Sequence, residues 1–89
     1  MYKIKKYSFD QAKKLNVNIK PSTRKNKKID VYKDDNYICS IGDSRYLDFP
    51  SYLLIDKDLA EKRRALYHKR HKKDNIEGTK GFYSLNILW

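Results

Sequence analysis

The sequence is poor in the residues from which several kinds of site are built. Its 89 residues include one cysteine, Cys39, and two histidines, His68 and His71. One thiol forms no internal disulfide, and three soft ligands cannot complete a four-ligand zinc finger, so both kinds of scaffold are excluded. No run of about 20 apolar residues occurs, as a membrane-spanning helix would need. The basic N-terminus is not followed by the apolar segment of a secretory signal, so we do not expect secretion.

Positive charge is what the sequence has in excess. It contains 21 Lys and Arg against 11 Asp and Glu, a formal net charge of +10. Residues 1–28 hold ten bases and one acid (net +9), residues 29–61 three and eight (net −5), and residues 62–89 eight and two (net +6). Two basic blocks around an acidic middle are typical of a protein that meets a polyanion. We therefore favour a nucleic-acid partner over a merely solvated basic surface, and we expect no cofactor.

The length allows one small domain over residues 1–89, and the pattern of apolar residues indicates the α+β class. Ser8 and Gln11 have the spacing of a capping box, which predicts a short capped helix over about residues 9–15. A proline then breaks the chain, because it lacks a backbone donor and restricts the residue before it. The basic segment that follows, residues 24–28, is predicted to be an exposed loop.

A β-hairpin is predicted in the middle of the chain. Four apolar residues alternate there with polar ones: Ile29, Val31, Cys39 and Ile41. If Lys33 pairs with Tyr37 across a three-residue loop, residues 34–36, all four side chains share one face, whereas a two-residue turn would shift the pairing. We therefore predict the longer loop with Asn36 in the left-handed region. The sheet is predicted to be either this hairpin alone or a three-stranded antiparallel sheet with a further strand from about residues 16–20.

Helical elements are predicted in the second half. The aromatic segment 46–52 is expected to pack over the sheet. Asp56 or Asp58 is expected to cap a long basic helix over about residues 59–73. Apolar side chains at a spacing of three or four within residues 82–89 predict one or two helical turns that close the core.

Two arginines occupy the apolar face of the long basic helix. On a helical wheel, Arg63 and Arg70 fall within the arc that holds the apolar side chains of this helix. Either they lie on the core and pair with Asp43 and Asp48, or they point into a groove that takes phosphates. We favour the structural ion pairs, because a buried charge without a partner costs several kcal/mol.

Catalysis and metal binding are not expected. His68 and His71 have an HxxH spacing, but the surrounding cations would repel a metal ion and no carboxylate lies one turn away on that face. Cys39 is on the inner face of a predicted strand, where it acts as a small hydrophobe. No nucleophile and base, and no cluster of carboxylates, are brought together, so we do not expect an enzyme.

The predicted function is nucleic-acid binding through phosphate contacts that depend little on base sequence. The side chains expected to make these contacts lie in the basic loop and on the long helix: Arg24, Lys25, Lys27, Lys28, Arg64, His68, Lys69, Lys72 and Lys73. Tyrosine stacking leaves single strands and RNA as further partners.

Five segments together resemble a family of small basic proteins of large DNA viruses of algae and amoebae. They are PSTRKNKK (residues 21–28), GDSRYLDF (42–49), the RRxxYxxRHKK pattern within residues 62–73, GTxGxxS (78–84) and the final LW (88–89). The resemblance covers about residues 20–89 and is specific in order and spacing.

The resemblance implies a viral protein located in the virion or inside the infected host cell, in cytoplasm or nucleus. In a DNA virus, double-stranded DNA is favoured over RNA as the partner. The alternative is a virion structural protein, in the capsid or core, whose basic faces bind acidic protein partners.

Overall fold

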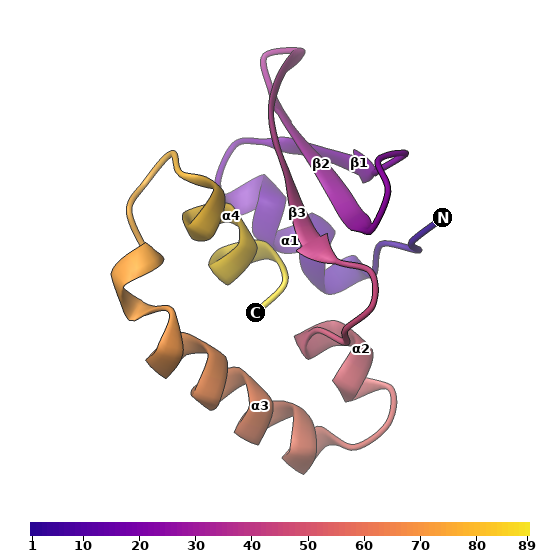
Figure 1. The fold of residues 1–89 in the computed structure, drawn as a ribbon, viewed down its shortest axis with the longest axis vertical. Coiled ribbons are helices and arrows are strands. Elements are labelled where there is room, and N and C mark those ends of the chain that lie inside the picture. Colours follow the sequence, from indigo (N-terminus) through magenta and orange to yellow (C-terminus); the bar gives the residue numbers. More distant parts are fainter.

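The computed structural model describes all 89 residues, and it confirms the α+β fold with four α-helices and a three-stranded antiparallel sheet (Figure 1). The strand order is β1-β2-β3, so the predicted third strand is present and pairs with β2. The elements, in chain order, are α1 (Lys6–Lys14), β1 (Asn18–Pro21), β2 (Lys27–Lys33), β3 (Asn36–Asp43), α2 (Phe49–Leu53), α3 (Lys57–Arg70), the 3₁₀ turn η1 (Lys72–Asp74) and α4 (Lys80–Ile87).

The hydrophobic core lies among the sheet, α1 and α4. Its nine buried residues are Ala12, Val17, Ile19, Ile29, Val31, Ile41, Tyr83, Ile87 and Leu88. Helix α3 contributes little to it, since its one buried residue is Ala60. Figure 1 shows α3 running along one side of the molecule, connected to the rest through α2 and η1. The face of α3 that was predicted to be packed is therefore largely open.

The hairpin reaches the predicted apolar pairing by a different route. The pairs Ile29 with Ile41 and Val31 with Cys39 are confirmed. The prediction of a three-residue loop with a left-handed Asn36 is wrong, because the turn consists of Asp34 and Asp35, with φ of 50° and 66°. Two left-handed residues match the twist of the strands, and Asp tolerates this conformation better than most residues. A register shift between Val31 and Tyr32 restores the apolar pairs.

The predicted capping box does not cap the N-terminus of helix α1. The helix begins three residues earlier than expected, after Lys5, which makes no side-chain cap. Ser8 Oγ instead donates to the Ile87 carbonyl at 2.9 Å, and Gln11 Nε2 donates to the Asn86 carbonyl at 2.9 Å. The last carbonyls of a helix have no partner within it. Ser8 and Gln11 therefore satisfy the end of α4 rather than the start of their own helix.

The helices of the second half begin at side-chain caps. Asp56 is the cap of α3, accepting from the backbone N–H groups of Asp58 and Leu59 at 2.9 and 3.3 Å, which confirms the first of the two alternatives. Thr79 caps α4 by accepting from the Phe82 N–H at 3.2 Å. Helix α3 ends at Arg70, three residues before the predicted end, and η1 follows.

Crowding at Gly42 gives a test of this packing. Gly42 has a φ of +78°, and a Cβ atom there would lie 2.7 Å from Leu88 Cδ1 and 2.9 Å from Lys28 Cδ. Gly78 also has a positive φ, +87°, but nothing lies within 4 Å of its Cβ position. We expect Gly42→Ala to lower the free energy of unfolding by about 1–3 kcal/mol more than Gly78→Ala, in denaturant titrations. Equal losses would show that only the backbone strain is felt.

Candidate functional site

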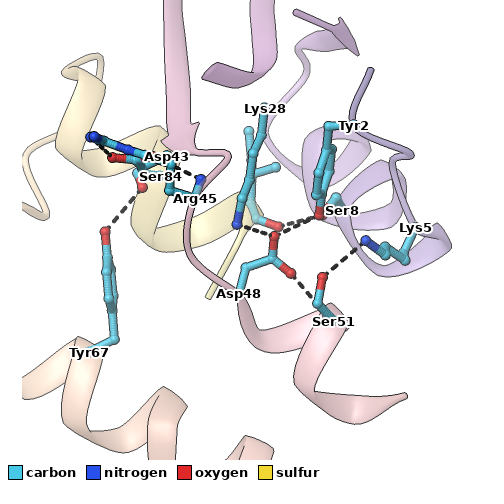
Figure 2. A network of polar contacts seen from close by, with 11 residues as sticks. Tyr2, Lys5, Ser8, Lys28, Asp43, Arg45, Asp48, Ser51, Tyr67 and Ser84 are labelled. Carbon is cyan, nitrogen blue, oxygen red and sulfur yellow. Dashed lines mark hydrogen bonds and ion pairs between the residues drawn. The ribbon is translucent and has the colours of Figure 1, made fainter. Parts of the chain in front are cut away.

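A buried carboxylate, Asp48, joins three separate segments of the chain. Only 1% of Asp48 is exposed. It accepts hydrogen bonds from Lys28 Nζ on β2 at 2.8 Å, from the Tyr2 hydroxyl at 2.7 Å and from the Ser51 N–H in the first turn of α2 at 3.0 Å. Figure 2 shows Lys28 and Tyr2 both directed at this carboxylate. The contact fixes the start of α2 against the sheet and the N-terminal segment.

The charges of this cluster stabilise one another. Burial alone would raise the pKa of Asp48, but the hydrogen bonds from Lys28 and Tyr2, with the Lys28 charge, outweigh it and hold the pKa below its usual range. Burial, followed by the hydrogen bond to Asp48, raises the pKa of Tyr2 well above its ordinary value. Asp48 is thus a carboxylate, and Tyr2 a neutral donor, throughout the neutral range.

Two predictions fail at this cluster. Lys28 was expected in an exposed basic loop, but it lies within β2, is 4% exposed and is paired with Asp48. Asp48 was expected to pair with Arg63 or Arg70, and its charge is already taken by Lys28. The strand begins at Lys27, so the basic run of the sequence continues into the sheet instead of ending before it.

Asp43 is also unavailable to the arginines of α3. It accepts from the Arg45 side chain at 3.0 Å (Nε) and 2.7 Å (Nη2), and from the Arg45 N–H at 2.9 Å. These hydrogen bonds hold the pKa of Asp43 far below its usual range. The predicted pairing of Asp43 with Arg63 or Arg70 is therefore wrong, because Arg45, two residues further along the chain, already pairs with this carboxylate.

Arg63 and Arg70 instead line a groove between α3 and the body of the domain. Neither forms an ion pair. The groove has a volume of about 560 Å³, and its walls come from the start of β2, the end of β3, the loop before α2, α3 and the end of α4. The side chains that give it its chemical character are Lys27, Arg63, Arg70 and His71, with the aromatic residues Tyr46, Tyr52, Tyr67 and Trp89.

Stacked rings form one wall of this groove. Trp89 and Tyr67 lie parallel, with ring centroids 4.4 Å apart and an angle of 7° between the planes. His71 stacks on Tyr67 at 4.1 Å, and Tyr52 lies 6.3 Å from Trp89. The Tyr67 hydroxyl and Ser84 Oγ share a hydrogen bond of 3.1 Å, which in Figure 2 connects α3 to α4. Tyr67, at the centre of this wall, is therefore held both by stacking on Trp89 and by its hydrogen bond to Ser84.

The Trp89 carbonyl oxygen is held by two residues that were predicted to contact phosphates. Arg64 Nε donates to it at 2.6 Å, and His68 Nε2 lies 3.1 Å from it. The Arg64 guanidinium also lies over the Phe49 ring, 5.1 Å from its centroid. Arg64 and His68 therefore hold Trp89 in place, and these contacts occupy side chains that were predicted to contact phosphates.

The remaining predicted contact residues are at the surface. Arg24 lies over the Tyr37 ring at 4.6 Å. Lys27 is half-buried in the groove wall, where the neighbouring Lys80 side chain and partial burial lower its pKa. The other four, Lys25, Lys69, Lys72 and Lys73, are exposed and form no ion pair.

The aromatic segment 46–52 was expected to pack over the sheet, but its buried ring, Phe49, lies against Tyr7 of α1, with centroids 5.1 Å apart, and is not part of the core cluster. Phe49 is buried, while Tyr46 is 69% exposed and Tyr52 is half-buried, and both tyrosines line the groove. The sequence does place Tyr46 directly after a turn and next to Arg45, a neighbourhood that favours exposure. The presence of three aromatic residues in this segment does not by itself predict which of them is buried and which two line the groove.

The structure also describes the candidates for metal and thiol chemistry. No group of three or more His, Cys, Asp and Glu lies close enough to hold a metal ion. Burial raises the pKa of Cys39, which packs against the core as predicted. Every helix is too short or too polar to cross a lipid bilayer.

No protein-family model, no curated protein and no solved structure matches the chain. The resemblance to the viral family therefore stays a prediction.

The buried pair of Lys28 and Asp48 can be tested by removing its cation. Lys28→Met leaves a carboxylate uncompensated in the interior, and we expect a loss of about 3–5 kcal/mol of stability. The matched control is Lys25→Met, because Lys25 is exposed and three residues away in the same basic run. Equal melting temperatures for the two variants would contradict the assignment of Asp48 as the buried anchor.

The same pair predicts an acid dependence of stability. The folded-state pKa of Asp48 is lowered, so its contribution is fully present above the unfolded pKa of about 3.9 and is lost as the pH falls below that value. Melting temperatures of the wild type and of Asp48→Asn should therefore begin to converge as the pH falls below about 4. A difference that stays constant down to pH 2 would show that the carboxylate charge is not involved.

Proposed function

We propose that the protein binds nucleic acid through phosphate contacts, with little dependence on base sequence. The observation that carries the proposal is the groove beside α3, which Arg63 and Arg70 line without forming an ion pair, while Asp43, the one acidic residue of the lining, is paired with Arg45. Arginine is suited to this role because its planar fork of donors matches the oxygens of a phosphate.

The arrangement of the cations supports an extended anionic partner. Arg63 and Arg70 are seven residues apart, so their Cα atoms lie about 10.5 Å apart along the axis of α3. Further exposed cations lie at Lys69 near the end of α3 and at Lys72 and Lys73 in the η1 turn that follows it. A partner with regularly spaced phosphates can contact all of them, whereas a single small anion cannot.

Double-stranded DNA remains the partner favoured by the resemblance to proteins of DNA viruses, with RNA as the next candidate. A location in the virion or inside the infected cell belongs to the same proposal. The exposed loop residues Arg24 and Lys25 supply a second, smaller group of cations for such a partner.

A virion structural role is the second candidate, and one observation favours it. Three consecutive apolar residues, at the end of α2 and directly after it, are exposed: Leu53 at 38%, Leu54 at 77% and Ile55 at 66%. Exposed apolar side chains that are contiguous in sequence are typical of surfaces that contact another protein. In this role the basic faces would bind acidic capsid or core proteins.

The salt dependence of binding separates the two functions. Each phosphate contact contributes about −0.9 to the slope of log K against log salt concentration, so about five to eight contacts give a slope of roughly −4 to −7. We expect this range for duplex DNA in fluorescence anisotropy titrations. A slope shallower than about −2, or no binding at low salt, would favour the structural role.

The groove arginines can be tested against a control of equal charge. We expect Arg63→Gln with Arg70→Gln to reduce the steepness of the slope by about 2 units and to leave the melting temperature nearly unchanged, since neither residue forms an ion pair. The control, Lys13→Gln with Lys14→Gln, removes the same charge from exposed positions on α1. If both double variants weaken binding equally, the affinity depends only on the net charge of the protein, and the groove is not the binding site.

A further inference from the structure

We propose that the groove beside α3 holds the base of one unpaired nucleotide, so that a single strand binds more tightly than a duplex of equal charge. The inference rests on the nucleic-acid binding proposed above, but it makes a single strand the tighter-binding partner in place of the duplex DNA that the resemblance favours. It adds a contact to a base, which phosphate contacts alone do not provide.

The first argument is the size and composition of the groove. A volume of about 560 Å³ is in the range of sites for small organic ligands. Rings and cations line it together, which fits a ligand with a flat aromatic part and an anionic part. An apolar ligand would leave Arg63 and Arg70 without a partner, and an acidic peptide would leave the rings without one. A nucleotide has both parts.

The second argument is an aromatic side chain in the groove that is largely exposed and on which no other ring of the protein stacks. Tyr52, Tyr67 and Trp89 each lie near another ring. Tyr46 lines the same groove, is 69% exposed, and takes part in no ring–ring pair and no cation–π contact. Tyr46 is therefore the side chain with a free face on which a base can stack.

The third argument concerns the strand state of the partner. Within a duplex, the faces of each base are covered by its neighbours, and only the edges are presented to a protein. Stacking on a side chain therefore requires an unpaired or extruded base. A ring with a free face next to groove cations is the arrangement by which proteins bind single strands without reading their sequence.

Lys27, in the groove wall, lies beside a second cation, Lys80, and near the Asp43 carboxylate. Lys27 lines the groove, and the adjacent Lys80 ammonium contributes to lowering its pKa. A phosphate close to Lys27 would relieve the repulsion between the two ammonium groups. We place the phosphate near the cations of the groove and the base against Tyr46.

The single tryptophan of the chain reports directly on the groove, because Trp89 lines it. The experiment titrates the protein with three ligands of equal phosphate number: a short oligothymidine, an abasic strand of the same length, and a duplex. Tryptophan emission and fluorescence anisotropy are both recorded. We expect the oligothymidine to change the Trp89 emission and to bind about five- to 100-fold more tightly than the abasic strand.

Tyr46→Ala is the decisive variant, and Phe9→Ala is its control. Phe9 is also an exposed aromatic residue, at 49%, but it lies on α1 outside the groove. We expect Tyr46→Ala to bind the oligothymidine no better than the abasic strand, and Phe9→Ala to behave as the wild type. Tyr46→Trp should retain the preference, since it keeps a stacking surface. Because both aromatic residues are exposed, unfolding is not expected, and circular dichroism verifies this.

Failure of this inference is distinguishable from failure of the proposed function. If all three ligands bind with equal affinity and the Trp89 emission is unchanged, or if Tyr46→Ala keeps the full preference for oligothymidine, the base site is disproved while phosphate binding stands. If none of the three binds at low salt, nucleic-acid binding itself fails, and the base site fails with it.

Discussion

The buried contact between Lys28 and Asp48 is the constraint on which the rest of the structure depends. Asp48 connects β2 with the cap of α2 and with the N-terminal segment, so it fixes where the chain leaves the sheet and where α2 begins. Since α2 leads directly into α3, the same contact determines where α3 stands relative to the core. It also consumes the carboxylate that Arg63 and Arg70 would otherwise pair with. The groove and its unpaired arginines thus follow from a buried salt bridge whose lysine, Lys28, also contributes to the wall of the groove.

Sequence reasoning was reliable where a periodic apolar pattern decided the outcome. The pairs Ile29 with Ile41 and Val31 with Cys39 had to share a face, because a one-residue slip would move each apolar side chain to the wrong side of the sheet. The turn that delivers this pairing was not predictable in the same way. Two different turns give the same apolar contacts once a bulge is allowed, and choosing between them depends on a local backbone preference of Asp34 and Asp35.

Polar side chains were harder to assign, because their partners are remote in the sequence. Ser8 and Gln11 have the spacing of a local cap, yet they bond to carbonyls of α4. Lys28 is one lysine in a basic run, and only the strand boundary distinguishes it from the exposed Lys25. The wheel of α3 correctly isolated Arg63 and Arg70 as unusual. Whether these arginines form ion pairs or line a groove depends on which cations pair with Asp43 and Asp48. Those cations lie outside α3, so the sequence of α3 does not predict the outcome.

The bonds that close the end of α4 have a consequence for biosynthesis. Ser8 and Gln11 reach partners 79 and 75 residues further along the chain. Helix α1 leaves the ribosome early, but the helix against which it packs is made near the end of this sequence. Until residues 86 and 87 have emerged, one face of α1 and one face of the sheet lack their partner and present apolar surface to the cell. Contacts of such long sequence separation slow folding, and they leave the nascent chain exposed to aggregation for most of its synthesis. A nascent chain with this much positive charge can also attract polyanions before it folds, since ribosomal RNA is the nearest one.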